Sequence, residues 1–222
     1  MKPVELVIVG AGDRGTVYAS YASENPDLAK VVGVAEPRDF YRQRMVEKHD
    51  IPRENVFTDW KDLSKKERFA DAVVIATQDS MHLGPAIAFA NKGYHMLLEK
   101  PMAPDEESCK EIVKAALDNR ILFAVAHVLR YTSYTRKLKE IIDSGAIGEV
   151  ISLHRLEPVG YWHQAHSFVR GNWRREDESS FMLLAKSCHD IDWIRHIVGK
   201  RCRAISSFGS LVHFREENKP IN

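Results

Sequence analysis

The sequence predicts an α/β protein whose first half folds as a parallel sheet with helices on both faces. Two observations support this prediction. The chain opens with a short apolar strand, 6–9, that runs into a glycine-rich turn and then into a helix. Further short apolar runs then alternate with longer helical patterns. Continuous apolar runs are typical of strands buried on both faces, and their alternation with helices predicts right-handed crossovers.

The glycine-rich turn has the pattern G-x-G-x-x-G. Gly10 allows a tight turn, Gly12 lets the backbone approach a pyrophosphate, and Gly15 lets the helix pack closely on the strand. Backbone amides at the start of the helix, including those of Asp13 and Arg14, then face the phosphates. The pattern alone is a weak signal, because a strand-to-helix turn can be rich in glycine without binding any ligand.

An acidic residue follows the turn where a dinucleotide requires one. The apolar run 30–35 indicates a second strand, and Glu36 ends it, about 20 positions after Gly15, where a carboxylate accepts hydrogen bonds from the adenosine ribose. Arg38 is suited to the 2′-phosphate of NADP, whereas Glu36 would repel that phosphate. Together these features predict a Rossmann nucleotide-binding domain that takes NAD, with NADP as the alternative.

Two later strands carry polar residues where they end. The runs 72–77 and 95–98 are strongly apolar, and ligands of open parallel sheets bind at the carboxyl ends of such strands. We therefore expect further cofactor contacts from Thr77, Gln78, His82, Glu99 and Lys100. Asp79 has a second interpretation, as the cap of the helix 81–91. For Lys100 the alternative is a surface ion pair with Glu99.

The other elements follow from periodicity and capping residues. In the first half we expect helices at 39–49 and 106–117, a helical turn after Asp59, and short strands at 55–58 and 122–126. We place a domain boundary after residue 127, which gives a nucleotide-binding domain at 1–127 and a smaller α+β domain at 128–222. In the second domain we expect helices at 134–142 and 181–198, strands at 151–156 and 203–214, and an aromatic-rich loop at 160–174.

The predicted helix 181–198 has two features of interest. Its apolar stripe consists of Leu184, Ile191, Ile194 and Val198. Lys186 and His189 are three positions apart, so they face the same side of the helix.

Composition limits the function classes. Of 222 residues, 44% are apolar and 28% charged, and 32 basic against 31 acidic residues give a net charge of +1. With no basic block, neither nucleic acid nor a membrane surface is expected as a partner. Three scattered cysteines and the lack of a secretory or membrane-spanning apolar run favour the cytoplasm. His163 and His166, with His154 and Cys188 elsewhere, form no closed ligand set, so no metal is expected.

From residue 4 to about residue 214 the chain resembles the Gfo/Idh/MocA oxidoreductases, and the distinguishing motif is Glu99-Lys100-Pro101. The resemblance implies an NAD(P)-dependent dehydrogenase that moves a hydride between nicotinamide and a CH–OH group of a sugar, polyol or related cyclic alcohol. It also implies a second domain with an open antiparallel sheet that holds substrate and makes a homo-oligomer contact. It places Lys100 beside nicotinamide and substrate, and a cis bond at Pro101.

The family's second motif, D-x-G-x-H-x-x-D, is only half present. His189 and Asp192 match its histidine and last aspartate, but Ala185 and Ser187 replace its first aspartate and its glycine. Lys186 is an additional cation. The family's trio of lysine, aspartate and histidine is therefore incomplete. The chain is also short for the family, so we expect an incomplete second sheet. Either the chain is a fragment or a naturally short form, or another chain completes the sheet.

The chemistry assigns roles to these residues. His189 is the natural general base, because an imidazole with a pKa of ~6.5 exchanges protons near neutral pH. Lys100 would hold the alkoxide-like oxygen by a charge-assisted hydrogen bond, and Lys186 would add a second donor. The expected pocket residues are His127, Arg130, Tyr131, Trp162, His163 and Asp192. The alternatives are an NAD-dependent hydrolase or lyase with transient hydride transfer, and a non-catalytic nucleotide-binding regulatory protein.

Overall fold

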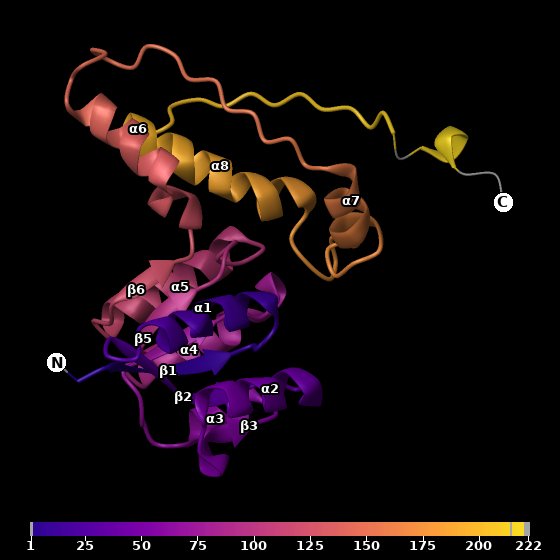
Figure 1. Cartoon of the computed structure of the whole chain (residues 1–222). Coiled ribbons are helices and arrows are strands. Elements are labelled where there is room, and N and C mark those ends of the chain that lie inside the picture. The colour runs from indigo at the N-terminus through magenta and orange to yellow at the C-terminus, as the bar shows by residue number, and fades with distance from the viewer. Residues whose placement is uncertain (1, 214, 220–222) are drawn as a thin grey trace.

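The computed structural model describes residues 2–213 and 215–219. Its first half is a parallel sheet between two layers of helices, and its second half is a group of helices and long connecting segments placed against one end of that sheet (Figure 1). The second half meets the sheet at the carboxyl ends of the strands, where ligands of such sheets bind.

The sheet has six parallel strands in the order β3-β2-β1-β4-β5-β6. Their bounds are Val4–Val9 for β1, Ala29–Ala35 for β2, Val56–Phe57 for β3, Ala72–Ile75 for β4, His95–Leu98 for β5 and Phe123–Val125 for β6. The strand order reverses between β1 and β4, which are direct neighbours. A doubly wound sheet opens a crevice at such a reversal, so the predicted Rossmann fold is confirmed and the crevice lies beside the glycine-rich turn.

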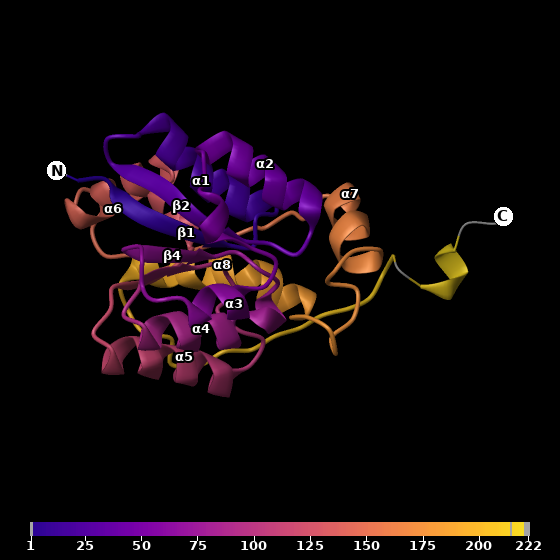
Figure 2. The ribbon, with the colours of Figure 1, turned by 90° about the horizontal axis from the view of Figure 1, so that it is seen from below.

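Helices cover both faces of the sheet, as Figure 2 shows. Helices α1 (Asp13–Glu24) and α2 (Asp39–His49) lie on one face, and α3 (Trp60–Lys65), α4 (Leu83–Asn91) and α5 (Glu106–Asp118) on the other. Successive strand residues alternate between the two cores, so that Ile8 packs toward α1 while Val7 and Val9 pack toward α4. This explains why consecutive residues of the central strands, such as 6–9 and 72–75, are apolar rather than every second one.

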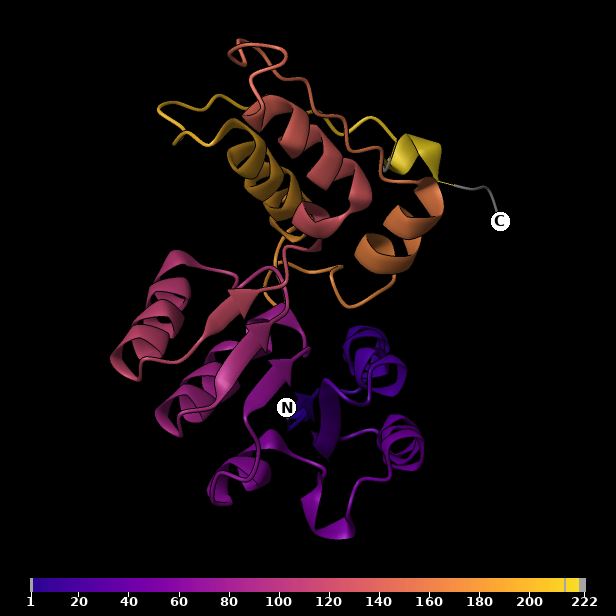
Figure 3. The same ribbon diagram turned by 60° about the vertical axis from the view of Figure 1, so that its left-hand side comes forward.

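The second half is mainly helical. It contains a short 3-10 turn at Val128–Tyr131, helix α6 (Ser133–Asp143), a helical turn α7 (Tyr161–His163) continued by a π-helical turn at Gln164–Val169, helix α8 (Met182–Val198) and a last 3-10 turn at Glu216–Asn218. Helices α6 and α8 lie side by side (Figure 3). The Trp193 indole Nε1 donates to Thr135 Oγ1 at 2.8 Å, and both side chains are buried between the two helices.

The two strands expected in this half are not formed. Residues 151–156 and 203–213 are without regular structure, and Phe214, the end of the second prediction, lies outside the described residues. A strand is stable only when a neighbouring strand accepts its hydrogen bonds, and the part of the chain that the structure describes offers neither segment such a neighbour. The sheet expected as substrate platform and oligomer contact is therefore absent from these residues.

The predicted apolar stripe of α8 is also wrong in its orientation. Ile191 and Ile194 are 60% and 37% exposed, whereas the buried residues of the helix are Ala185, Asp190, Trp193 and Ile197. The helix is turned by its polar anchors, because the Trp193 N–H bonds to Thr135 and the Asp190 carboxylate accepts from Arg155 Nε at 2.9 Å. Because buried polar groups require partners, the helix face that carries Trp193 and Asp190 is the one packed against Thr135 and Arg155.

Candidate cofactor and substrate site

The glycine-rich turn is too tightly packed for side chains. Gly10 has φ +88°, and a Cβ there would lie 2.7 Å from the carbonyl oxygen of Ala76 on the neighbouring strand. A Cβ on Gly15 would lie 1.9 Å from the Gly10 carbonyl oxygen. No side chain caps the N-terminus of α1, so its first amides point into the crevice without a side-chain acceptor. This arrangement is suited to a pyrophosphate.

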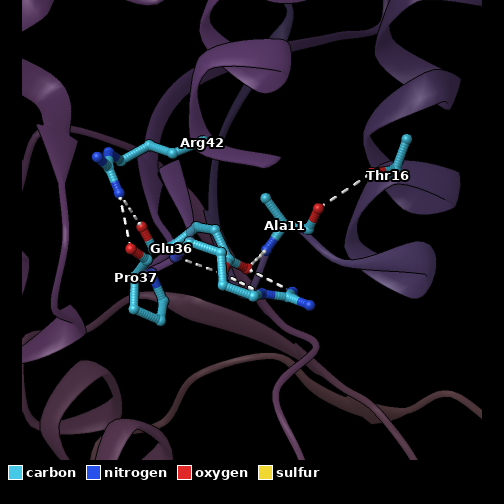
Figure 4. A network of polar contacts seen from close by, with 6 residues as sticks. Ala11, Thr16, Glu36, Pro37 and Arg42 are labelled. Carbon is cyan, nitrogen blue, oxygen red and sulfur yellow. Dashed lines mark hydrogen bonds and ion pairs between the residues drawn. The ribbon is translucent and has the colours of Figure 1, made fainter. Parts of the chain in front are cut away.

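Glu36 lies at the end of β2 and is only 2% exposed. Its Oε2 accepts from the Ala11 amide at 2.8 Å, and its Oε1 accepts from Arg38 Nε at 2.7 Å. Burial alone would raise the pKa of Glu36, but the hydrogen bonds from Arg38 and Ala11 outweigh it, so the pKa lies below its usual value. Arg42 Nη1 donates to the backbone carbonyls of Glu36 and Pro37, which fixes this corner (Figure 4). The charged carboxylate is thereby held beside the glycine-rich turn.

The end of β4 offers a polar atom without a partner. Thr77 Oγ1 is buried and has no hydrogen-bond partner in the structure. It lies next to the turn, since the Thr77 amide nitrogen is 3.0 Å from the position of a Gly10 Cβ. Buried hydroxyls are rarely left unpaired unless a ligand or water completes them. With the glycines, the uncapped helix and Glu36, this orphaned hydroxyl fits a dinucleotide.

His82 is buried at the ends of β4 and β5. It is 1% exposed, and its Nδ1 lies 3.1 Å from the carbonyl oxygen of Pro101 while its Nε2 lies 3.2 Å from that of Thr77. The ring therefore links the segments that follow β4 and β5. Gln78 and Asp79 follow Thr77 at the same edge.

A cavity of about 170 Å³ lies between the end of β5 and the second half of the chain. Five of its lining residues were singled out in the sequence, and three were not: Val128, Leu129 and Glu157. The five expected ones are Arg14, Glu99, Lys100, Lys186 and His189. The structure therefore brings residues from the glycine-rich turn, from the fifth strand and from α8 to one cavity.

Lys100 bridges the two halves of the molecule. Its Nζ donates to the backbone carbonyl oxygen of Ala185 at 3.0 Å, and the Lys100–Pro101 peptide bond is cis, as the resemblance implied. Glu99 is not its partner, because the Glu99 carboxylate accepts from the Tyr18 hydroxyl at 2.6 Å and from the Lys100 amide at 2.7 Å. The alternative of a Lys100–Glu99 surface ion pair is therefore wrong, and a backbone carbonyl holds the lysine at the position of the missing aspartate.

His189 lies on α8 in a partly buried, cationic environment. Burial, followed by the charge of Lys100 and the proximity of His127, lowers its pKa to about 4. The rings of His127 and His189 meet edge to face with centroids 5.9 Å apart, and the Nδ1 atoms of both rings are buried without a partner. At neutral pH His189 is therefore a neutral imidazole, which is the form that accepts a proton.

Asp192 pairs with Arg130 and lies near His127. Arg130 Nε donates to Asp192 Oδ2 at 2.7 Å, and Arg130 Nη2 contacts the other carboxylate oxygen. His127 Nε2 lies 3.9 Å from Asp192 Oδ1. Arg130 and Asp192, both expected in the pocket, thus form an ion pair that supports His127 and does not line the cavity.

Lys186 reaches the cavity from α8, one turn before His189. Its Nζ lies 2.7 Å from His163 Nε2. Burial and the nearby charge of Lys100 lower its pKa. None of the six expected pocket residues is part of the cavity lining. His127 and His163 contact the lining residues His189 and Lys186, whereas Tyr131 is 67% exposed, and Trp162 is 66% exposed and stacks on His163.

Sequence reasoning missed the contacts that hold the second half in place. Asp79 Oδ2 accepts from the Trp173 indole Nε1 and from the Ser180 amide, each at 3.2 Å. Asp79 is 3% exposed, and its other oxygen accepts from the Ser80 amide within the 3-10 turn Asp79–Met81. No side chain caps this turn or helix α4, so the expected capping role of Asp79 is wrong. The sequence offered one partial indication of this contact: Trp173 lies in the aromatic-rich loop, and the indole N–H of a partly buried tryptophan needs an acceptor.

These features together define a dinucleotide-binding Rossmann protein whose cavity combines a lysine and a histidine. The residues 4–127 match the family model for the oxidoreductase family with an NAD-binding Rossmann fold, and residues 135–219 match a model of the Gfo/Idh/MocA C-terminal domain. The chain belongs to the Gfo/Idh/MocA oxidoreductase family, which confirms the resemblance found in the sequence.

Relatives with curated names differ in what they act on. The chain is 27% identical to a 2,7-anhydro-N-acetylneuraminate hydratase of Mediterraneibacter gnavus over 98% of this chain and 55% of that protein. It is 30% identical to the levoglucosan dehydrogenase of Pseudarthrobacter phenanthrenivorans over 66% of this chain and 37% of that protein. The chain thus spans about half the length of the curated relatives it matches.

Solved structures agree with the fold. The scyllo-inositol dehydrogenase of Lactobacillus casei, in its apo form, superposes with a TM-score of 0.73 at 25% identity over 89% of this chain and 55% of that one. A second structure of that enzyme, with NAD(H) and scyllo-inositol bound, gives a TM-score of 0.75 at 24% identity over 89% of this chain and 57% of that one. Among the described residues, no helix is long and apolar enough to cross a membrane.

Proposed function

We propose that the chain forms the cofactor-binding and catalytic part of an NAD-dependent dehydrogenase acting on a CH–OH group of a sugar, polyol or related cyclic alcohol. The observation that carries this proposal is the meeting of Lys100 and His189 at one cavity beside the glycine-rich turn. The family membership and the inositol and levoglucosan dehydrogenases among its relatives support it.

NAD supplies the hydride acceptor when bound, and the protein supplies its position and the proton chemistry. The amides at the start of α1 and the carboxylate of Glu36 would hold the pyrophosphate and the adenosine ribose. Glu36 favours NAD over NADP, because a buried carboxylate repels a 2′-phosphate at the same place. At the end of β4, the coenzyme would supply the hydrogen-bond partner that the buried Thr77 hydroxyl lacks.

Lys100 and His189 have different roles at the substrate hydroxyl. Lys100 is held by the Ala185 carbonyl with two of its three N–H donors left for the substrate oxygen, whose negative charge it stabilises. His189 is neutral at pH 7 and is the proposed acceptor of the hydroxyl proton, because the negative charge that develops on the substrate oxygen beside it favours the protonated ring. The His189 ring that would take this proton contacts the His127 ring, and His127 Nε2 lies 3.9 Å from Asp192 Oδ1.

The domain division at residue 127, the cytoplasmic location and a homo-oligomer belong to the same proposal. The two family models, which end at 127 and begin at 135, support the division. The expected route to an oligomer, through a second sheet, has no support in the described residues.

A Lys100→Met variant tests the catalytic assignment. We expect NADH formation with the accepted alcohol, found in a panel of sugars, inositols and anhydrosugars, to fall by about 100-fold or more, because a charged donor to the developing oxyanion is lost. NAD affinity should change far less than turnover, since the α1 amides and Glu36 hold the pyrophosphate and the adenosine ribose. Lys200→Met, which removes an exposed lysine after α8, is the matched control. Unchanged turnover in Lys100→Met would contradict the proposal.

The hydratases among the relatives give a second candidate, in which hydride transfer is transient and the cofactor returns unchanged. The same panel separates the two functions. Steady accumulation of NADH indicates a dehydrogenase, whereas product without net NADH indicates a hydratase or lyase.

A further inference from the structure

The cavity carries more positive groups than its chemistry requires. Arg14, Lys100 and Lys186 line it together with two carboxylates, Glu99 and Glu157. Hydride transfer at an alcohol uses one ammonium, that of Lys100, and Arg14 lies on the turn that faces the cofactor phosphates. Lys186 therefore has no role in the reaction as proposed.

Both carboxylates of the lining are already engaged. Glu99 accepts from the Tyr18 hydroxyl and from the Lys100 amide. Glu157 Oε2 accepts from Arg155 Nη2 at 2.9 Å, and Arg155 also pairs with Asp190. In the part of the chain that the structure describes, no carboxylate lies within 4.0 Å of the ammonium of Lys100 or of Lys186. The two ammonium groups thus share one cavity, and neither is ion-paired with a carboxylate.

Lys186 is held in place by a neutral partner. Its Nζ lies 2.7 Å from His163 Nε2, and a ring nitrogen that accepts from an ammonium carries no charge. This contact uses one of the three N–H donors and leaves two directed away from His163. Burial and the charge of Lys100 lower the pKa of Lys186, and the negative charge of a bound anion would raise it again.

We propose that the cavity selects an anionic sugar or polyol, and that Lys186 is the residue that binds its carboxylate or phosphate group. This inference rests on the proposed function and narrows its substrate class. Lys100 would contact the reacting hydroxyl of the substrate. Lys186, one turn before His189 on α8, would contact the charged group of the same substrate. The carboxylate or phosphate of the substrate then supplies the ion-pair partner that Lys186 lacks in the described residues.

Calorimetric titration of the protein saturated with NADH tests this inference, because an alcohol then binds without being oxidised. The probes are D-glucuronate, D-glucose 6-phosphate and D-glucose. We expect at least one of the two anions to bind about tenfold more tightly than glucose, the gain of a charge-assisted hydrogen bond. Which anion binds better distinguishes a carboxylate from a phosphate. The preference should fall as salt is raised.

Lys186→Met should reduce the preference for the anion to about twofold or less, while Lys200→Met, with the same change of net charge, keeps it. Equal affinity of the native protein for glucose and for both anions, or no binding of either anion, would overturn the inference. So would a preference that survives in Lys186→Met.

Loss of NADH binding in Lys186→Met would reveal a misfolded variant. The salt series on the native protein then tests the inference, because an anion preference that does not fall as salt is raised would contradict it. Failure of the native protein to bind NADH contradicts the proposed function instead, and the same titrations without cofactor still decide whether the cavity takes an anion.

Discussion

Asp79 at the end of β4 accepts a hydrogen bond from the Trp173 indole Nε1 at 3.2 Å, across a separation of 94 positions in the chain. The same carboxylate oxygen accepts from the Ser180 amide. One buried acidic side chain of the first half therefore fixes the segment that leads into α8. Since α8 begins at Met182 and carries Lys186 and His189, this contact ties the segment just before the helix to the end of β4.

Asp79→Ala should lower the free energy of unfolding by about 1–3 kcal/mol, because two buried N–H groups lose their acceptor. Urea denaturation of the variant and of the native protein measures the difference. Asp62→Ala removes an exposed aspartate that pairs with Lys65, and we expect it to change stability by less than about 0.5 kcal/mol. Equal effects of the two substitutions would show that Asp79 is not a structural tie.

Glu36→Ala should weaken NAD binding by roughly 10- to 100-fold, the loss of charge-assisted hydrogen bonds to the ribose. It should also raise the affinity for NADP relative to NAD, because Arg38 loses its carboxylate partner and becomes free to pair with a 2′-phosphate. Titration with both coenzymes measures the two affinities. Glu47→Ala, at an exposed position of α2, is the control. An unaltered NADP to NAD ratio in Glu36→Ala would contradict the assignment of the ribose site.

Gly10→Ala tests the packing of the glycine-rich turn. The added Cβ meets the Ala76 carbonyl oxygen at 2.7 Å, and the residue has φ +88°, which strains any L side chain. We expect a loss of at least about 1–2 kcal/mol in the free energy of unfolding. Gly209→Ala has nothing within 4 Å of its Cβ and should change stability little. Thermal unfolding of the two variants side by side gives the comparison, and a stable Gly10→Ala protein would speak against the turn as described.

The low pKa of His189 makes stability depend on pH. Because the pKa is about 4 in the folded protein and ~6.5 in the unfolded chain, the unfolded chain binds more protons between these values, so stability falls as pH drops from 6.5 toward 4 and is complete above 6.5. His189→Gln should reduce the loss between pH 7 and pH 5 by about 1 kcal/mol after allowance for partial exposure. His154→Gln, at an exposed position, is the control. The opposite trend, a steeper loss in His189→Gln, would contradict the burial of a neutral imidazole.

The sequence was sufficient for the Rossmann half because its signals are local. Short apolar runs, glycines at fixed spacing and an acidic residue at the end of the second strand each depend on neighbours along the chain. Helix α2 was predicted with its observed bounds, and Lys100 and His189 were found through their motifs.

The second half was predicted less well, because its structure depends on distant partners. A strand at 151–156 requires a neighbour that the described residues do not provide, and the burial of α8 is set by Thr135 and Arg155, which come from other segments. Glu157 reaches the cavity from an irregular segment whose periodicity gives no sign of it.

Calorimetric titration of the purified chain with NAD tests the central claim most directly, because the turn, Glu36, Lys100 and His189 are all interpreted around this coenzyme. The account predicts saturable uptake of one NAD per chain, with NADP bound more weakly. Heats no larger than those of dilution for both coenzymes would contradict it.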